Sequence, residues 1–263
     1  MLKVIFIFFI FTLSIFADEH YAKLEPLQSI TIRSEVNGKV VVAKSNLEGK
    51  VANGLVVKID DKLDKLDLKH SLESLNLIDK MIRVNRDILP LLKKSFEKKR
   101  NMYLKVAPLS SSSVSTKDSL YSAFVSAKSQ YSSILEKILN LENQKVSLEQ
   151  KVALLKNIID KKSIIVKNRY LYALNVKSGE YVNIGASIAI VQDISRAKLT
   201  LYLSEDELKG IEKKRIYING KETNLKFSKI WKVADTKYIS SYKAEIITKP
   251  FARFSKLIKI DIK

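Results

Sequence analysis

The 263-residue sequence contains no cysteine, which excludes disulfides, thiolate metal sites and a lipid anchor attached to a cysteine. It has only two histidines, His20 and His70, and its three methionines form no cluster, so we expect no bound transition metal. No glycine-rich phosphate loop and no serine–histidine–aspartate set is recognisable, and carboxylate pairs such as Asp60–Asp61 more simply cap helices or end strands. The sequence therefore predicts neither an enzyme nor a cofactor.

Glycine is scarce and unevenly placed, because none of the seven glycines lies between Gly54 and Gly179. That glycine-free middle carries apolar residues at alternating steps of three and four, which is the pattern of a coiled-coil seam. Eight of eleven positions are apolar in the first series and eleven of twelve in the second. The pattern predicts two helices of similar length in an antiparallel hairpin. The two series run from Leu68 to Tyr103 and from Leu120 to Ile159, and the predicted helices span about 62–105 and 116–161.

Prolines and serines mark the expected ends of these helices. Pro90 lies inside the first helix and is expected to kink or interrupt it, because proline removes one backbone hydrogen bond. Pro108 is expected to end that helix. Ser115, followed three residues later by Asp118, resembles a capping box and is expected to start the second helix. A polar tip near 106–115 would join the two.

The segments on either side of the hairpin resemble each other. GKVANG, which starts at Gly49, and GEYVNIG, which starts at Gly179, each precede a short β-prone run that ends in aspartate. Neither side can bury its apolar face alone, so we expect the two to form one small β sandwich. After residue 193, alternating leucines, a helix start at Ser204 and the hairpin-turn signal Asn219–Gly220 predict a small β barrel.

The chain is strongly basic, with a formal net charge of +19. The lysines are spread along the whole sequence and alternate with leucine and glutamate, and no basic patch is interleaved with aromatic residues. We therefore expect solvated helix faces and attraction to an anionic membrane surface, and no nucleic-acid partner.

The N-terminus carries Lys3 and then a 13-residue apolar run, Val4 to Phe16, interrupted only by Thr12 and Ser14. This run is shorter than the roughly 20 residues that a membrane-spanning helix needs. We predict a secretory signal peptide that is cleaved after Ala17. An uncleaved anchor is the alternative.

This arrangement resembles the periplasmic adaptor proteins, also called membrane fusion proteins of the HlyD type. The two glycine-containing half-motifs and the segment DISRAKLTLYLSEDELKGI (193–211) carry the resemblance. It implies an elongated α+β fold, in which a split lipoyl-like β sandwich is interrupted by a coiled-coil α-hairpin and followed by a β barrel. The lipoyl resemblance implies no cofactor, because Lys58 lacks the motif that lipoylation requires. The expected divisions are 1–17 (signal peptide), 18–61 (N-terminal strands and first half of the lipoyl-like domain), 62–161 (hairpin), 162–193 (second half) and 194–263 (β barrel).

The resemblance also suggests what the tip does. Adaptors that dock on TolC-like outer-membrane channels carry an R-x3-L-x6-S pattern at the tip, and Arg100, Leu104 and Ser111 match this spacing. Ser115 is an alternative to Ser111, because several serines follow one another here.

The resemblance implies a periplasmic adaptor subunit associated with the inner membrane. It would assemble with its own copies into a ring or funnel, a trimer or a hexamer. That assembly would bridge an inner-membrane transporter and a TolC-like channel in the export of small molecules or proteins. The alternative hypothesis is an exported coiled-coil scaffold of the cell envelope that has no channel partner.

Overall fold

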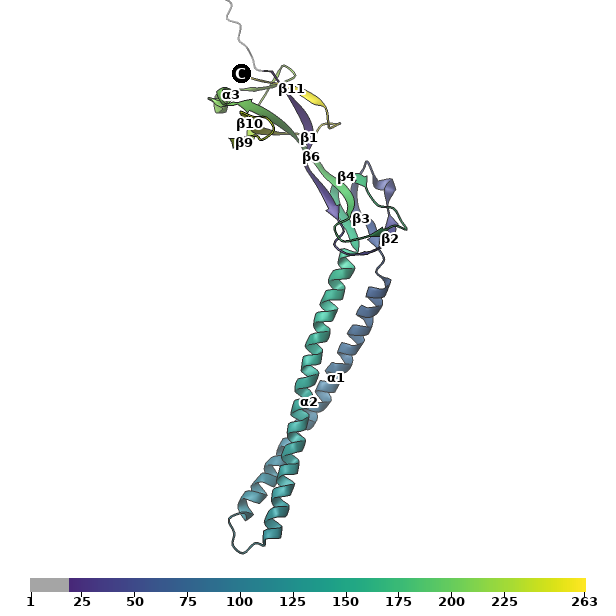
Figure 1. Cartoon of the computed structure of the whole chain (residues 1–263), viewed down its shortest axis with the longest axis vertical. Coiled ribbons are helices and arrows are strands. Elements are labelled where there is room, and N and C mark those ends of the chain that lie inside the picture. Colours follow the sequence, from purple (N-terminus) through teal and green to yellow (C-terminus); the bar gives the residue numbers. More distant parts are fainter. Residues whose placement is uncertain (1–18) are drawn as a thin grey trace, which may run out of the picture.

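The computed structural model describes residues 19–263, and the expected signal peptide lies outside them. The described part is elongated, with two long helices at one end and strands at the other (Figure 1). No helix within residues 19–263 has an apolar stretch long enough to cross a membrane. The helices are α1 (Lys62–Val106), α2 (Val114–Lys161) and α3 (Glu205–Leu208). The strands are β1 (Glu19–Arg33), β2 (Gly38–Ala43), β3 (Val51–Ile59), β4 (Ser163–Leu174), β5 (Tyr181–Val182), β6 (Ser187–Ser204), β7 (Ile216–Ile218), β8 (Lys221–Thr223), β9 (Phe227–Ala234), β10 (Ser241–Thr248) and β11 (Leu257–Ile262).

Helices α1 and α2 pack along each other as an antiparallel hairpin (Figure 1). The Arg86 guanidinium lies 2.6 Å from Glu142, and the Lys145 ammonium lies 2.8 Å from Asp79. The residue that comes earlier in α1 thus contacts the residue that comes later in α2, as expected for antiparallel helices. Every buried side chain of these two helices occupies a position of the predicted 3–4 seam. These side chains are Ser71, Ile82, Asn85, Ala127, Ile138, Leu141, Val152 and Leu155.

Helix α1 continues through Pro90 without a break, so the predicted interruption is wrong. Proline has no N–H to donate to the carbonyl of Arg86, one turn earlier. Both residues are exposed, so water can bond that carbonyl while the opposite face of α1 stays packed on α2. The exposed position therefore makes Pro90 tolerable inside the helix.

The strands enclose two separate hydrophobic clusters. The cluster next to the helices contains Val56, Ile59, Leu171 and Ile188 among its fully buried side chains. Here β3 pairs antiparallel with β4, so the chain before the hairpin and the chain after it share one sheet. The second cluster lies farther from the helices. It contains Leu199, Leu201, Leu203, Ile216, Ala244, Ile246 and Ile260.

Two long strands, β1 and β6, run through both clusters and pair with each other. The first residues of β1 belong to the second cluster, where Ala22 and Leu24 are fully buried, whereas Ile32 packs against the first cluster. The start of β1 therefore contributes to the second cluster, and its end contributes to the first. Its strands follow the order β9-β10-β6-β1-β11-β7-β8. No described backbone ladder joins β8 to β9, so a closed barrel stays a prediction.

The bend between the clusters coincides with a β-bulge in the β1–β6 pair. The register shifts between Pro26 and Gln28. Next to it, the Asp193 carboxylate accepts hydrogen bonds from the Ser195 hydroxyl (2.6 Å) and the Ser195 backbone N–H (3.0 Å), and it forms an ion pair with Arg169 of β4. These hydrogen bonds, with Arg169 adding to them, lower the pKa of Asp193 to about 2.

The substitution Asp193→Asn is expected to destabilise the β region at neutral pH by about 1–2 kcal/mol. Because folding lowers the pKa of Asp193, its stabilisation is present above about pH 4 and is lost as the pH falls toward 2. Urea unfolding should therefore separate the variant from the wild type at pH 7 and bring them together near pH 2. The control is Asp206→Asn, because Asp206 is almost fully exposed in its pair with Lys209. Equal stabilities of the wild type and Asp193→Asn at pH 7 would contradict this role.

Candidate functional site at the hairpin tip

The tip is a short, ordered turn between the two long helices. Helix α1 ends at Val106, and the N–H of Ala107 still donates to the carbonyl of Tyr103 at 2.8 Å. Pro108 follows at once, where a further helical turn is disfavoured. The N–H of Leu109 then donates to the carbonyl of Val106 (3.1 Å), which reverses the chain.

Ser113 caps helix α2, so the predicted capping box at Ser115 and Asp118 is wrong. Ser113 has an extended backbone, and its hydroxyl accepts a hydrogen bond from the N–H of Thr116 (3.1 Å). Helix α2 therefore begins at Val114, and Ser115 lies in its first turn. Several neighbouring serines have a side chain that can cap a helix, and only the backbone path selects one of them.

All four predicted tip residues lie at the free end of the hairpin, and all four are exposed. Arg100 and Leu104 are four residues apart on α1 and therefore lie on one face. The Leu104 side chain is 51% exposed, because the neighbouring Tyr103 occupies the seam. Among residues 19–263, Arg100 forms no ion pair. The Arg100 guanidinium, the Leu104 side chain and the hydroxyls of Ser111 and Ser115 are thus all accessible to a partner.

An aromatic cluster lies directly behind the tip. The rings of Tyr103 and Tyr121 are 5.3 Å apart, and Phe124 lies 6.2 Å from Tyr103 and 5.8 Å from Phe96. Tyr131 continues the stack on Phe96 at 5.9 Å. Four of these rings are seam positions, whereas Tyr121 lies one residue off the seam and was not predicted. Stacked rings hold the helix ends together, so they fix the positions of the exposed tip residues.

The opposite end of the hairpin is held by charged side chains. Lys58 of β3 forms an ion pair with Asp61 and donates a hydrogen bond to the Ser163 hydroxyl of β4 (2.7 Å). Burial alone would raise the pKa of Asp61, but hydrogen bonds from Lys58 and Lys65 outweigh it and keep that pKa below its usual value. Lys162 and Asp64 form a second ion pair between the two helix ends. Lys58 therefore connects the helices to the sheet.

Within the described residues 19–263, no group of three or more histidine, cysteine, aspartate or glutamate side chains is placed to hold a metal ion. The chemistry that the tip offers is recognition, through one guanidinium, one apolar side chain and small hydroxyls.

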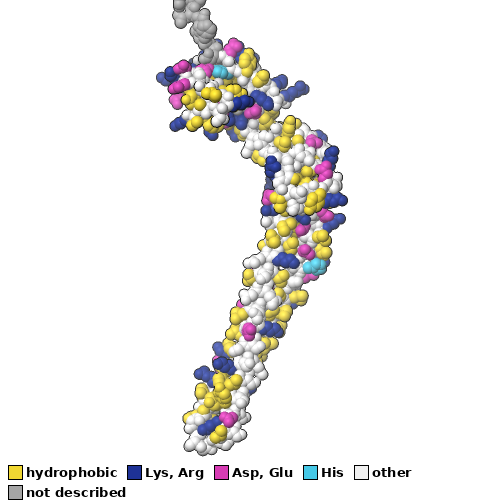
Figure 2. All heavy atoms as spheres, viewed as in Figure 1, with side chains coloured by type: hydrophobic (Ala, Val, Ile, Leu, Met, Phe, Trp, Pro, Cys, Tyr) yellow, Lys and Arg dark blue, Asp and Glu magenta, His cyan; other side chains and the backbone are white. Residues whose placement is uncertain are grey.

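Each helix of the hairpin also carries an exposed apolar stripe, which was not predicted from the sequence. In α1 the stripe occupies positions one residue before the seam, and in α2 positions one residue after it. Because the helices are antiparallel, these two offsets lie on opposite faces of the hairpin. Hydrophobic side chains are visible along the hairpin surface in Figure 2. The α1 stripe is Leu77, Met81, Val84, Ile88 and Leu91, with exposed fractions of 38–66%, and the α2 stripe is Val125, Leu135, Leu139 and Val146.

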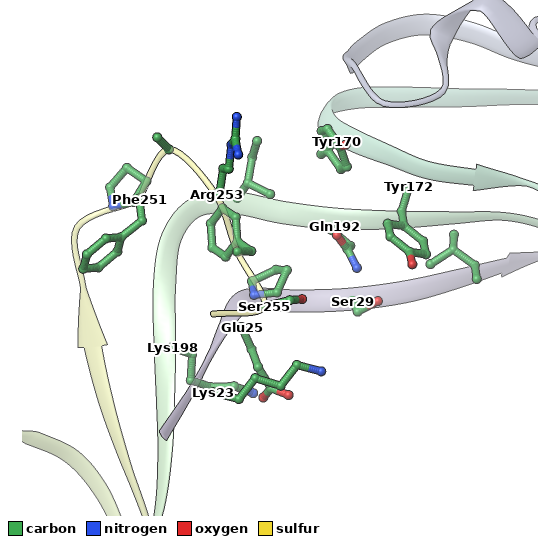
Figure 3. Close-up of a pocket in the computed structure, with 16 residues that line it drawn as sticks. Lys23, Glu25, Ser29, Tyr170, Tyr172, Gln192, Lys198, Phe251, Arg253 and Ser255 are labelled. Atoms are coloured by element: carbon green, nitrogen blue, oxygen red, sulfur yellow. The ribbon is translucent and has the colours of Figure 1, made fainter. Parts of the chain in front are cut away.

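A half-open cavity of about 800 Å³ lies at the bend between the two clusters. Tyr170 and Tyr172 of β4 lie on one side of it, and Phe251 and Arg253 of the loop before β11 lie on the other, with Gln192 of β6 between them (Figure 3). Its walls belong to different clusters, so a change in the bend would change its shape.

No protein-family model and no curated protein sequence matches the chain. Solved structures do. MacA from Actinobacillus actinomycetemcomitans matches with a TM-score of 0.62 at 17% identity, over 94% of this chain and 79% of that one. The membrane fusion protein Spr0693 from Streptococcus pneumoniae matches with a TM-score of 0.57 at 9% identity, over 94% of this chain and 99% of that one. The chain has the membrane fusion protein fold.

A MacA–MexA chimera that contains the α-hairpin domain of Pseudomonas aeruginosa MexA also matches. Its TM-score is 0.53 at 16% identity, over 94% of this chain and 81% of that chain. The resemblance that the sequence predicted is thereby confirmed at the level of the fold. In the membrane fusion protein fold, Arg100, Leu104, Ser111 and Ser115 lie near the end of α1, in the turn and at the start of α2, which is the end of the hairpin farthest from the strands (Figure 1).

Proposed function

We propose that the protein is a periplasmic adaptor subunit of an export system, which bridges an inner-membrane transporter and a TolC-like outer-membrane channel. The observation that carries the proposal is the exposed set Arg100, Leu104, Ser111 and Ser115 at the free end of the hairpin. Helices of 45 and 48 residues extend roughly 68–72 Å at 1.5 Å per residue, which suits a lever that reaches a distant partner. The exported substrate would be a small molecule or a protein.

The tip residues suit docking on the helical end of a channel. The Arg100 guanidinium can donate several hydrogen bonds to carbonyl or carboxylate oxygens. Leu104 supplies an exposed apolar anchor one helical turn away, and such anchors dominate interface energies when a partner buries them. A small hydroxyl at Ser111 or Ser115 permits close approach of the partner backbone. The tip would thus bind its partner without any covalent chemistry.

The two apolar stripes support self-association into a ring. The α1 stripe of one copy can pack on the α2 stripe of the next, because they lie on opposite faces of the hairpin. Such a contact joins two different surfaces, and a series of these contacts forms a ring when the rotation between copies closes. The chain would act as a trimer or a hexamer that forms a funnel.

The experiment that tests this function is purification of the affinity-tagged wild type from envelopes of cells that carry its native partners. We expect both an integral inner-membrane transporter and an outer-membrane channel to co-purify. Recovery of the folded, exported protein with neither partner would contradict the adaptor function and favour the envelope scaffold.

A further inference from the structure

The strands β9 and β10 form a hairpin at the end of the molecule farthest from the helical tip (Figure 1). Ser241, the first residue of β10, pairs with Ser204, the last residue of β6, so the loop 235–240 lies beside α3. The N-terminal end of the described chain lies at the same place. Glu19 pairs with Asp261 of β11, and the His20 ring lies 2.5 Å from Glu207 of α3.

This β9–β10 hairpin exposes large apolar side chains at its turn. Ile239 is 86% exposed, more than any other large hydrophobic residue in residues 19–263. Val233 is 78% exposed and Tyr238 is 44% exposed. Inward-facing residues such as Ile230 and Phe227 already fill the second cluster, so the exposed ones are additional to the core.

Hydrogen bonds and aromatic packing fix the conformation of this turn, in which Ile239 is exposed. The Asp235 carboxylate accepts hydrogen bonds from the backbone N–H groups of Lys237 (2.8 Å) and Tyr238 (3.1 Å). The Tyr238 ring packs against the Tyr202 ring of β6 in a tilted arrangement, with centroids 4.2 Å apart. These contacts hold the loop on the sheet, while Ile239 stays exposed.

Lysines surround these apolar residues. Residues 226–249 contain six lysines and two acids, and both acids are already engaged. Asp235 orders the turn, and Glu245 lies 3.2 Å from Lys243. Lys229 and Lys243 lie over the Trp231 ring, at 4.3 and 4.5 Å from its centre. Basic, acidic and hydrophobic side chains are intermixed over this end of the molecule in Figure 2.

The patch was not predicted from the sequence, although Lys229, Trp231, Lys237 and Tyr238 all lie within residues 229–238, and the fold adds contacts from two further strands. Trp231 comes from β9, Lys243 from β10 and Tyr202 from β6. We define the β9–β10 patch as Lys229, Trp231, Lys232, Val233, Lys237, Tyr238 and Ile239.

We propose that the β9–β10 patch docks the protein on a bilayer that contains anionic phospholipids. Its chemistry is that of an interfacial anchor: tryptophan and tyrosine favour the headgroup level, Val233 and Ile239 can enter the acyl boundary, and the lysines are attracted to anionic headgroups. A protruding turn suits a bilayer surface. The orientation rests on the proposed function, which directs the tip to the outer membrane and this patch to the inner one.

The test uses the purified mature chain and vesicles of phosphatidylcholine alone or mixed with phosphatidylglycerol. Trp231 is the only tryptophan, so its fluorescence reports directly on the patch. We expect co-sedimentation with the phosphatidylglycerol vesicles and a blue shift of the emission, both weakened by high salt. Phosphatidylcholine vesicles should bind the chain at least about tenfold more weakly.

Two double variants decide where binding occurs. Val233→Asp with Ile239→Asp alters exposed residues and should reduce vesicle binding by about tenfold or more while the chain stays folded. Lys80→Gln with Lys94→Gln removes two positive charges from the exposed hairpin surface and should leave binding unchanged.

Three outcomes would overturn the proposal: no binding to anionic vesicles, equal losses in both double variants, or binding without a fluorescence shift. Crosslinking of the patch to the transporter in cells, without any vesicle binding, would replace the bilayer by a protein partner. Vesicle binding needs neither transporter nor channel, so its failure is distinguishable from failure of the adaptor function.

Discussion

Arg100→Glu combined with Leu104→Asp is expected to abolish export while the hairpin stays folded. The change reverses the charge that would meet oxygen atoms of the channel and places a carboxylate where an apolar side chain should be buried. Loss of two central contacts of about 2 kcal/mol each would weaken channel binding by roughly a thousandfold. Both side chains are exposed and outside the seam, so helix packing should be unaffected. Accumulation of the exported substrate in the medium gives the measurement.

The control for this variant is Leu66→Asp. Leu66 lies on the same helix and is 49% exposed, almost as much as Leu104, but it is close to the strands. It should support normal export at equal protein level. Normal export by the tip variant, or an equal loss in the Leu66 control, would contradict the docking role of the tip.

Val84→Glu combined with Ile88→Glu is expected to prevent self-association. Both residues lie in the middle of the α1 stripe, where a neighbouring copy would bury them against its α2 stripe. Burying two carboxylates without partners costs several kcal/mol, so association should weaken by at least about a hundredfold. Analytical ultracentrifugation should show the wild type as an oligomer and the variant as a monomer.

Lys80→Gln with Lys94→Gln is the matched control, because it changes the net charge by the same two units on exposed positions of α1. This control should associate like the wild type, and thermal unfolding by circular dichroism should show that both variants keep their helices. A glutamate variant that associates as tightly as the wild type would remove the stripes from the interface.

The hairpin could be predicted from sequence because its packing follows a local repeat of apolar residues at steps of three and four. Ile82 and Leu141 are buried at positions that steps of three and four select, and no long-range information is needed to find them. The same repeat, displaced by one residue, marks the exposed stripes, and Val84 and Ile88 could have been recognised from it.

The strand pairing was harder to predict because it is non-local. Ala22 and Leu24 are buried against residues more than two hundred positions later, such as Ile258 and Ile260, and nothing in their own segment indicates that partner. Trp231 contacts Lys229 of its own strand and Lys243 of β10, and only the second contact is non-local.

The tip could be located from sequence only in part. Pro108 marks the end of the first helix, but several adjacent serines offer the same capping hydroxyl. Backbone geometry selects Ser113 as the cap, and it leaves both Ser111 and Ser115 exposed. The choice between those two serines depends on the partner surface.

Site-specific crosslinking in living cells tests the bridging role most directly. The chain has no native cysteine, so Ser111→Cys and Ser115→Cys each carry a single crosslinker, and Ser132→Cys, at an exposed position partway along α2, is the control. We predict a crosslink from Ser111, Ser115 or both to one outer-membrane channel, and none from Ser132. Absence of any channel crosslink from both tip positions, in cells that express the partner, would contradict it.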